Sequence, residues 1–149
     1  GWFGVLAMPG GILLYKNNYY RELYYESSQQ ELNPPNHGIF IKTENIEEEL
    51  RIQTMKLGLD TMESNEFVEY WTPRLKALNK KYILFSILDK KEKERTDHVE
   101  INPKPDTFIE FIAYFKGVDE EFETKLFNPP TPPKRIGFTA VEWGGIIDR

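Results

Sequence analysis

Between residues 45 and 79 the apolar residues recur every three or four positions, which is the spacing of one face of an α-helix. Two runs show this spacing: Ile46, Leu50, Thr54 and Leu57, then Phe67, Trp71, Leu75 and Leu78. Asn45 and Thr61 are suitable N-cap residues, and Gly58 suits a left-handed turn that ends the first helix. Pro73 lies inside the second run, where we expect a kink or a restart. The pattern predicts a helical hairpin with one apolar side.

Short strands joined by turns are predicted on both sides of this hairpin. The expected strands are 2–8, 12–15, 19–26 and 38–42 before it, and 82–88, 98–102, 108–116 and 136–147 after it. Residues 82–88 are apolar at both alternating sets of positions, which indicates a central strand covered on both faces. The helical pair needs an apolar partner, so we expect an α+β fold. In this fold a largely antiparallel β-sheet has the two-helix hairpin, about residues 45–79, packed on one face.

Two polar segments separate the later strands. Residues 89–97 are nearly all charged, and we interpret them as a solvated hairpin tip. Residues 119–133 are acidic and then proline-rich, a linker-like excursion before the last strand that forms a stiff spacer or an SH3-type ligand. We interpret residues 1–149 as a single α+β domain. Because the chain starts with Gly1 and no Met, we expect it to be the C-terminal part of a longer chain.

Composition argues against several classes of function. The 149 residues include no cysteine, 19 Lys and Arg and 24 Asp and Glu, which gives a net charge of −5. The lack of thiols excludes a disulfide scaffold, a cysteine-ligated metal and a cysteine nucleophile. The acidic balance argues against a nucleic-acid partner. No apolar run approaches the roughly 20 residues that span a bilayer, so we expect no direct membrane insertion.

The sequence predicts no metal site and no cofactor. His37 and His98 are the two histidines, and neither has a second histidine at ligand spacing. Phosphate-binding loops and the common nucleophile motifs are absent from the sequence. The remaining enzymatic hypothesis is a carbohydrate-active hydrolase that uses paired carboxylates beside aromatic rings, Glu26 with Glu69 or Glu142.

Adjacent tyrosines indicate a binding surface. Tyr19-Tyr20 and Tyr24-Tyr25 each place one ring on either face of a strand, so both rings of a pair cannot enter the same core. A ring left outside can stack on a sugar or anchor a protein partner. A sheet that is buried on both faces explains the pairs equally well. The candidate binding residues are Tyr20, Tyr24, Tyr25 and Trp143.

Several short motifs follow one another along nearly the whole chain. They are Gly1-Trp2, Pro9-Gly10-Gly11, Leu23-Tyr24-Tyr25-Glu26, Gly38-Ile39-Phe40-Ile41, Leu57-Gly58-Leu59, Glu66-Phe67-Val68-Glu69-Tyr70-Trp71-Thr72-Pro73, Pro103-Lys104-Pro105-Asp106 and Gly137-Phe138-Thr139-Ala140-Val141-Glu142-Trp143-Gly144-Gly145. Together they resemble a mainly bacterial, functionally uncharacterised family whose longer members start with a Lys-Pro-Val-Ile-Tyr-Leu-Tyr-Pro-type segment, which this sequence lacks. Many members look secreted or envelope-anchored. The resemblance therefore implies an extracellular or cell-envelope location, and it supplies no catalytic residues.

These features favour a non-catalytic binding or structural module of a surface-exposed or multi-subunit protein. Aromatic strands occur without a catalytic constellation, and an unpaired strand edge in such a fold invites a partner to add a strand. The expected partner is another protein or the remaining part of the same chain, with a glycan as a further ligand class. The contrasting hypothesis is the hydrolase with paired glutamates.

Overall fold

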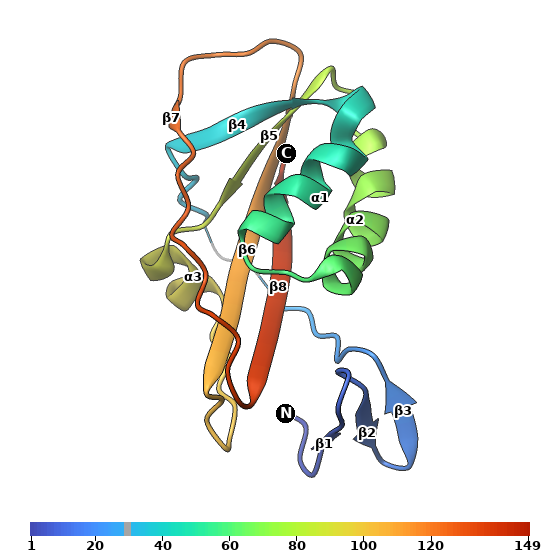
Figure 1. Ribbon diagram of the computed structural model, residues 1–149. Helices are drawn as coiled ribbons and strands as arrows, with labels where there is room; N and C mark the ends of the chain where they lie inside the picture. The colour runs from blue at the N-terminus through green and yellow to red at the C-terminus, as the bar shows by residue number, and fades with distance from the viewer. Residues whose placement is uncertain (29–30) are drawn as a thin grey trace. The chain divides into compact units, whose positions relative to one another are not determined.

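The computed structural model describes residues 1–28 and 31–149, and the chain divides into two compact units, Gly1–Gln30 and Glu31–Arg149 (Figure 1). The first unit contains a three-stranded sheet and the second a five-stranded sheet with helices. The predicted α+β domain over residues 1–149 spans both units. Among the described residues, no helix is long and apolar enough to cross a membrane.

The first unit is an antiparallel meander of very short strands. Strand β1 (Leu6–Ala7) pairs with β2 (Leu13–Tyr15), and β2 pairs with β3 (Asn18–Tyr20). Lys16 and Asn17, between β2 and β3, have φ angles of 47° and 64°, as a tight hairpin turn requires. The first and third strands predicted in this region are too long, because only two or three residues of each pair with a neighbour.

The second unit contains a mixed sheet in the order β7-β4-β5-β6-β8. Its strands are β4 (His37–Lys42), β5 (Tyr82–Ile87), β6 (Thr107–Val118), β7 (Lys125–Leu126) and β8 (Thr139–Asp148). The central strand β5 pairs antiparallel with β4 and β6. The outer strands β7 and β8 instead run parallel to β4 and β6. The predicted α+β class is confirmed, and so is the central position of the strand near residues 82–88.

The predicted helical hairpin is also confirmed. A short 3₁₀ turn, η1 (Thr43–Asn45), leads into α1 (Ile46–Lys56), and α2 (Thr61–Lys76) follows. The N-cap of α2 is Asp60 rather than Thr61. The Asp60 side chain accepts a hydrogen bond from the backbone N–H of Glu63, and the Glu63 side chain accepts one from the backbone N–H of Asp60.

A glycine ends α1, whereas the proline inside α2 does not end that helix. Gly58 has a φ of 110°, and its N–H donates to the carbonyl of Met55 while that of Leu59 donates to Thr54, both at 3.1 Å. This is the left-handed C-terminal motif expected from the glycine. The predicted restart at Pro73 is wrong, because α2 continues through it to Lys76 and Pro73 lies in the last turns of the helix.

The helical hairpin covers one face of the sheet and shares an aromatic core with it. Leu50, Phe67 and Leu75 are fully buried. The Trp71 ring lies 5.0 Å from the Phe115 ring, measured between centroids. A Cβ atom on Gly145 would lie 2.4 Å from the Trp71 ring, so only glycine fits where β8 passes beneath this indole. The core joins α1 and α2 to β4, β5, β6 and β8.

A third helix, α3 (Lys90–Thr96), follows β5 and contradicts the solvated hairpin tip predicted at residues 89–97. Asp89 caps this helix by accepting a hydrogen bond from the backbone N–H of Glu92 at 2.8 Å. Glu92 and Lys93 are buried although their neighbours are exposed. The strand predicted at 98–102 is also wrong, since residues 97–106 form no strand in the described chain.

The linker-like interpretation of residues 119–133 is wrong in part. Strand β7 lies within this segment and pairs with β4 at the sheet edge. Phe127 is buried, 5.6 Å from the Phe85 ring and 5.9 Å from the His37 ring between centroids. The second half of the segment is therefore fastened to the sheet at Phe127.

Candidate functional site

Strand β8 forms a long, open edge of the five-stranded sheet. It spans ten residues, all of them half-buried, and among residues 31–149 it pairs with β6 and with no other strand. Its sequence contains neither lysine nor proline, which natural proteins commonly use to blunt an exposed edge. The opposite edge strand, β7, spans two residues and begins with Lys125. The two edges therefore differ in their capacity to accept another strand.

Alternate residues of β8 contribute to opposite faces of the sheet. Val141, Trp143 and Ile147 belong to the core under the helical hairpin, whereas Ile146 packs on the other face. The Trp143 ring lies 5.1 Å from the Phe67 ring in an edge-to-face arrangement. Trp143, predicted as a binding residue, therefore packs beneath α2 and does not form an exposed platform.

Of the candidate catalytic glutamates, Glu69 and Glu142 belong to the second unit and Glu26 to the first. Glu69 is exposed on α2, on the helical side of the sheet. Glu142 is adjacent to Trp143 on β8, so its side chain points to the opposite face of the sheet. There its carboxylate accepts a hydrogen bond from Lys93 of α3. Glu26 lies in the N-terminal unit, where it accepts a hydrogen bond from the Tyr24 hydroxyl at 2.6 Å. Glu69 and Glu142 therefore lie on opposite sides of the sheet, and the pairing of Glu26 with either of them stays a prediction.

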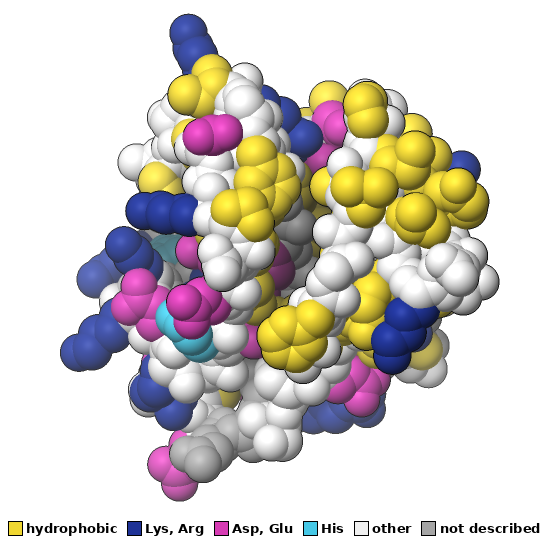
Figure 2. Space-filling model, turned by 90° about the horizontal axis from the view of Figure 1, so that it is seen from below, with side chains coloured by type: hydrophobic (Ala, Val, Ile, Leu, Met, Phe, Trp, Pro, Cys, Tyr) yellow, Lys and Arg dark blue, Asp and Glu magenta, His cyan; other side chains and the backbone are white. Residues whose placement is uncertain are grey.

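The three candidate tyrosines lie in the N-terminal unit. Tyr20, Tyr24 and Tyr25 are between 38% and 59% exposed, and the Tyr25 ring meets the Trp2 ring edge-on at 6.2 Å. No described residue of this unit is buried. Figure 2 shows apolar side chains gathered on the surface that it draws. The meander therefore has exposed aromatic rings, and the use of Tyr20, Tyr24 and Tyr25 in binding stays a prediction.

A partly buried charged cluster joins α3 to the sheet. Lys93 lies 3.1 Å from a carboxylate oxygen of Glu110 and 2.9 Å from one of Glu142, which are neighbours across the β6–β8 pair. Burial alone would lower the pKa of Lys93, but the hydrogen bonds and charges of Glu142 and Glu110 outweigh it and raise this pKa. Lys93 therefore neutralises two adjacent carboxylates and holds α3 against the sheet.

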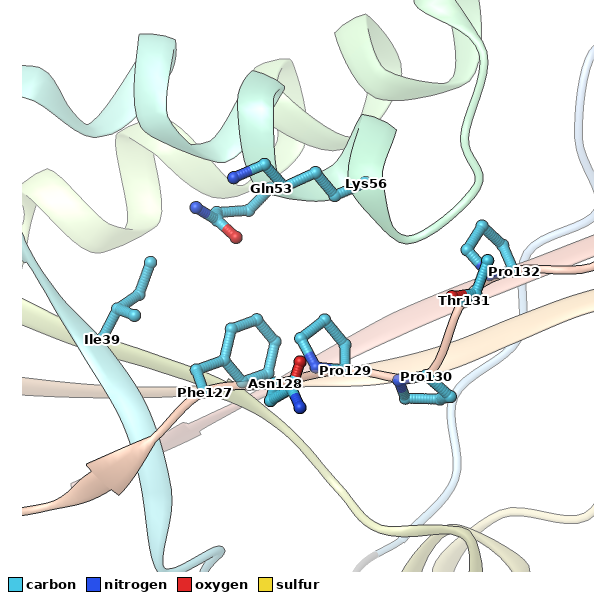
Figure 3. A pocket seen from close by; sticks show the side chains of 9 residues that line it. All are labelled: Ile39, Gln53, Lys56, Phe127, Asn128, Pro129, Pro130, Thr131 and Pro132. Atoms are coloured by element: carbon cyan, nitrogen blue, oxygen red, sulfur yellow. The ribbon is translucent and has the colours of Figure 1, made fainter.

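A cavity of about 450 Å³ separates α1 from the proline-rich segment (Figure 3). Gln53 and Lys56 reach toward it from α1, and Ile39 and Phe127 line it from the sheet side. Asn128 and the residues up to Pro132 complete the lining. This volume is in the range of small-molecule sites.

A second cavity of about 210 Å³ lies between residues 33–37 and the start of α3. Its main polar groups already have protein partners. The Glu92 carboxylate accepts hydrogen bonds from the backbone and side-chain amides of Asn33 and from Arg95, and His37 Nδ1 lies 2.9 Å from the Ser86 hydroxyl. Among the described residues, no group of three or more His, Cys, Asp or Glu side chains could hold a metal ion.

The edge at β8, the cavity and the charged cluster were not located from the sequence. The apolar, lysine-free stretch 139–148 was a signal for the edge, but its place at the side of the sheet depends on pairing between distant strands. The cavity had no signal, because its lining comes from segments separated by more than 70 residues.

Comparisons of the chain with protein-family models, with curated proteins and with solved structures found no match. The resemblance described from the sequence motifs therefore stays a prediction.

Proposed function

We propose that the protein is a non-catalytic binding module that accepts an extended segment of a protein partner as an additional strand beside β8. The observation that supports this proposal is the ten-residue edge of β8, which is long, half-buried and contains neither lysine nor proline. Unpaired backbone N–H and C=O groups along such an edge form a ready template for strand addition. Covering it would prevent the edge-to-edge aggregation that an open strand otherwise permits.

The geometry of the edge defines the partner. At about 3.3 Å per residue, the ten residues of β8 offer an edge roughly 33 Å long. The backbone of the partner supplies the hydrogen bonds, so its sequence is read through side chains at alternate positions. On the helical face these side chains would lie beside Val141 and Trp143, which favours apolar residues at every second position of the partner.

The resemblance implies an extracellular or cell-envelope location and membership of a mainly bacterial, uncharacterised family, and both are part of this proposal. A strand-accepting module suits a surface-exposed or multi-subunit protein, in which the added strand comes from another subunit or from the remaining part of the same chain. The alternative to this proposal is the hydrolase hypothesis, in which Glu26 pairs with Glu69 or Glu142; Glu69 and Glu142 themselves lie on opposite sides of the sheet. The exposed tyrosines remain compatible with a glycan ligand.

Adjacent proline substitutions test the proposal. Along an edge strand, successive backbone N–H groups point alternately toward the neighbouring strand and away from it. Of Ala140→Pro and Val141→Pro, one variant therefore loses a bond to β6 and the other loses only an outward donor. Ten-residue peptides selected from a random phage-displayed library are the probe. We expect them to slow hydrogen exchange of outward β8 amides in the wild-type chain.

The same peptides should bind weakly to the folded proline variant that lacks the outward donor. Leu126→Pro, on the opposite edge strand, is the matched control and should bind as the wild type does. Selected peptides that leave β8 exchange unchanged would contradict the proposal. So would failure to select any peptide, or full protection of the outward amides in the free chain.

A further inference from the structure

Residues 127–132, here called the strap, are fastened at both ends. At the first end Phe127 is buried among aromatic rings of the sheet. At the second end Pro132 approaches the turn after α1 so closely that a Cβ on Gly58 would lie 2.8 Å from Pro132 Cβ. Just beyond the strap, Arg135 donates a hydrogen bond to the Gly58 carbonyl at 2.9 Å and another to Glu63 at 3.0 Å. The strap is therefore held against the ends of α1 and the sheet.

Between these two attachments the strap does not close onto α1. The cavity of about 450 Å³ lies in this interval, bounded by α1, β4 and the strap (Figure 3). The cavity is open to solvent on one side, so a small molecule can enter it from the surface. Because both ends of the strap are fixed, the chain cannot fill the space by a simple inward shift. The cavity therefore lies between two fixed attachments of the strap.

The lining combines one cation with amides and an apolar floor. Lys56 and Gln53 extend from α1 along the cavity, and Figure 3 shows their polar ends close together above the ring of Phe127. Within the described chain, the side chains of Gln53, Lys56 and Asn128 make no hydrogen bond or ion pair with another residue. The lining includes no acidic side chain. A ligand must therefore offer an anion to Lys56 and apolar surface to the proline and phenylalanine rings.

We propose that this cavity binds a small organic carboxylate with a hydrocarbon or aromatic body. The carboxylate would accept charge-assisted hydrogen bonds from Lys56 and a further bond from the Gln53 amide. The body would lie against Phe127 and the strap prolines. Lys56 is the basic residue in the last turn of α1, where the free carbonyl ends of the helix repel anions. Lys56 itself, and not the helix, must then supply the attraction.

Titration of the full chain with hexanoate and with benzoate tests this site, and hexanamide and benzamide serve as neutral probes of the same shape. Binding is followed through the NMR signals of the Gln53 and Asn128 side-chain amides and the Ile39 methyl groups. We expect saturable shifts with at least one carboxylate. The affinity measured for the corresponding amide should be at least about tenfold weaker. No saturable shift with either acid, or equal affinity for acid and amide, would overturn the proposal.

Substitutions at Lys56 test whether its positive charge binds the carboxylate. Lys56→Gln should weaken carboxylate binding about tenfold or more, whereas Lys56→Arg should retain most of it. Lys76→Gln is the matched control, because Lys76 occupies the last turn of α2 and lies outside the cavity lining. Equal loss in the Lys56→Gln and Lys76→Gln variants would show non-specific attraction and overturn the site. Because the cavity and the β8 edge share no residues, either proposal can fail without the other.

Discussion

On one face of the five-stranded sheet the contact with α1 and α2 is made by aromatic rings, whereas on the other face the contact with α3 is made by charged side chains. Phe67 and Trp71 fill the helical side and touch Phe115 of β6. On the opposite side Lys93 reaches two carboxylates of β6 and β8. An apolar contact does not depend on one particular partner atom. A buried charge, in contrast, destabilises the fold when one of its charged partners is removed. The two faces should therefore respond to substitution in different ways.

The largest effect is expected on the aromatic face. Trp71→Ala should lower the free energy of unfolding by about 3–5 kcal/mol, because it removes a buried indole and leaves a cavity against Phe115. Urea denaturation of the full chain measures the change. Met62→Ala, at an exposed position of the same helix, is the control and should cost under about 1 kcal/mol. A loss below about 1 kcal/mol for Trp71→Ala would mean that the ring is not part of a packed core.

The charged face should show coupling that the aromatic face lacks. Lys93→Met is expected to cost about 3 kcal/mol, because it leaves the carboxylates of Glu142 and Glu110 without their shared cation. The double variant Lys93→Met/Glu142→Gln should recover part of that loss, which a double-mutant cycle by urea denaturation detects. Lys91→Met, exposed on the same helix, should change stability by less than about 0.5 kcal/mol. Equal effects at positions 91 and 93 would remove the distinction between the two faces.

The smallest effect concerns pH and is confined to the charged face. The Arg95 hydrogen bond, together with the backbone N–H of Asn33, lowers the pKa of Glu92 from 4.5 to about 2. A depressed carboxyl pKa contributes stability above pH 4.5 that is lost as the pH falls toward about 2. Denaturation across this interval should show a smaller acid-induced loss in Glu92→Gln than in the wild type. Glu94→Gln, at an exposed position, should retain the wild-type profile, and an unchanged Glu92→Gln profile would contradict the assignment.

Sequence periodicity located the aromatic face because its residues are apolar and regularly spaced. Leu50, Phe67 and Leu75, predicted on the inner side of the hairpin, are all fully buried. The charged face escaped the same reasoning because Lys93 looks like its exposed neighbours in the sequence. What distinguishes it is the position of Glu110 and Glu142 on adjacent strands, and that depends on the parallel pairing of β6 with β8.

The candidate site residues likewise divide into those that the sequence could place and those that it could not. Local chemistry indicated only that the two rings of a tyrosine pair cannot share one core, since adjacent residues on a strand point to opposite faces. It was insufficient for Trp143 and Glu142, whose surroundings are set by α2 and α3. The strap illustrates the point further. Its prolines indicate a stiff segment, but its attachment at Phe127 and beside Gly58 is a property of the folded chain.

Because the Trp71 ring lies against Gly145, the fluorescence of this tryptophan depends on the position of strand β8. A displacement of β8 changes the surroundings of an indole that is otherwise shielded from solvent, and Trp143 lies on the strand itself. The intrinsic fluorescence of the native protein should therefore respond when a segment docks along the sheet margin. An emission spectrum, recorded without any label, provides a direct readout of occupancy there.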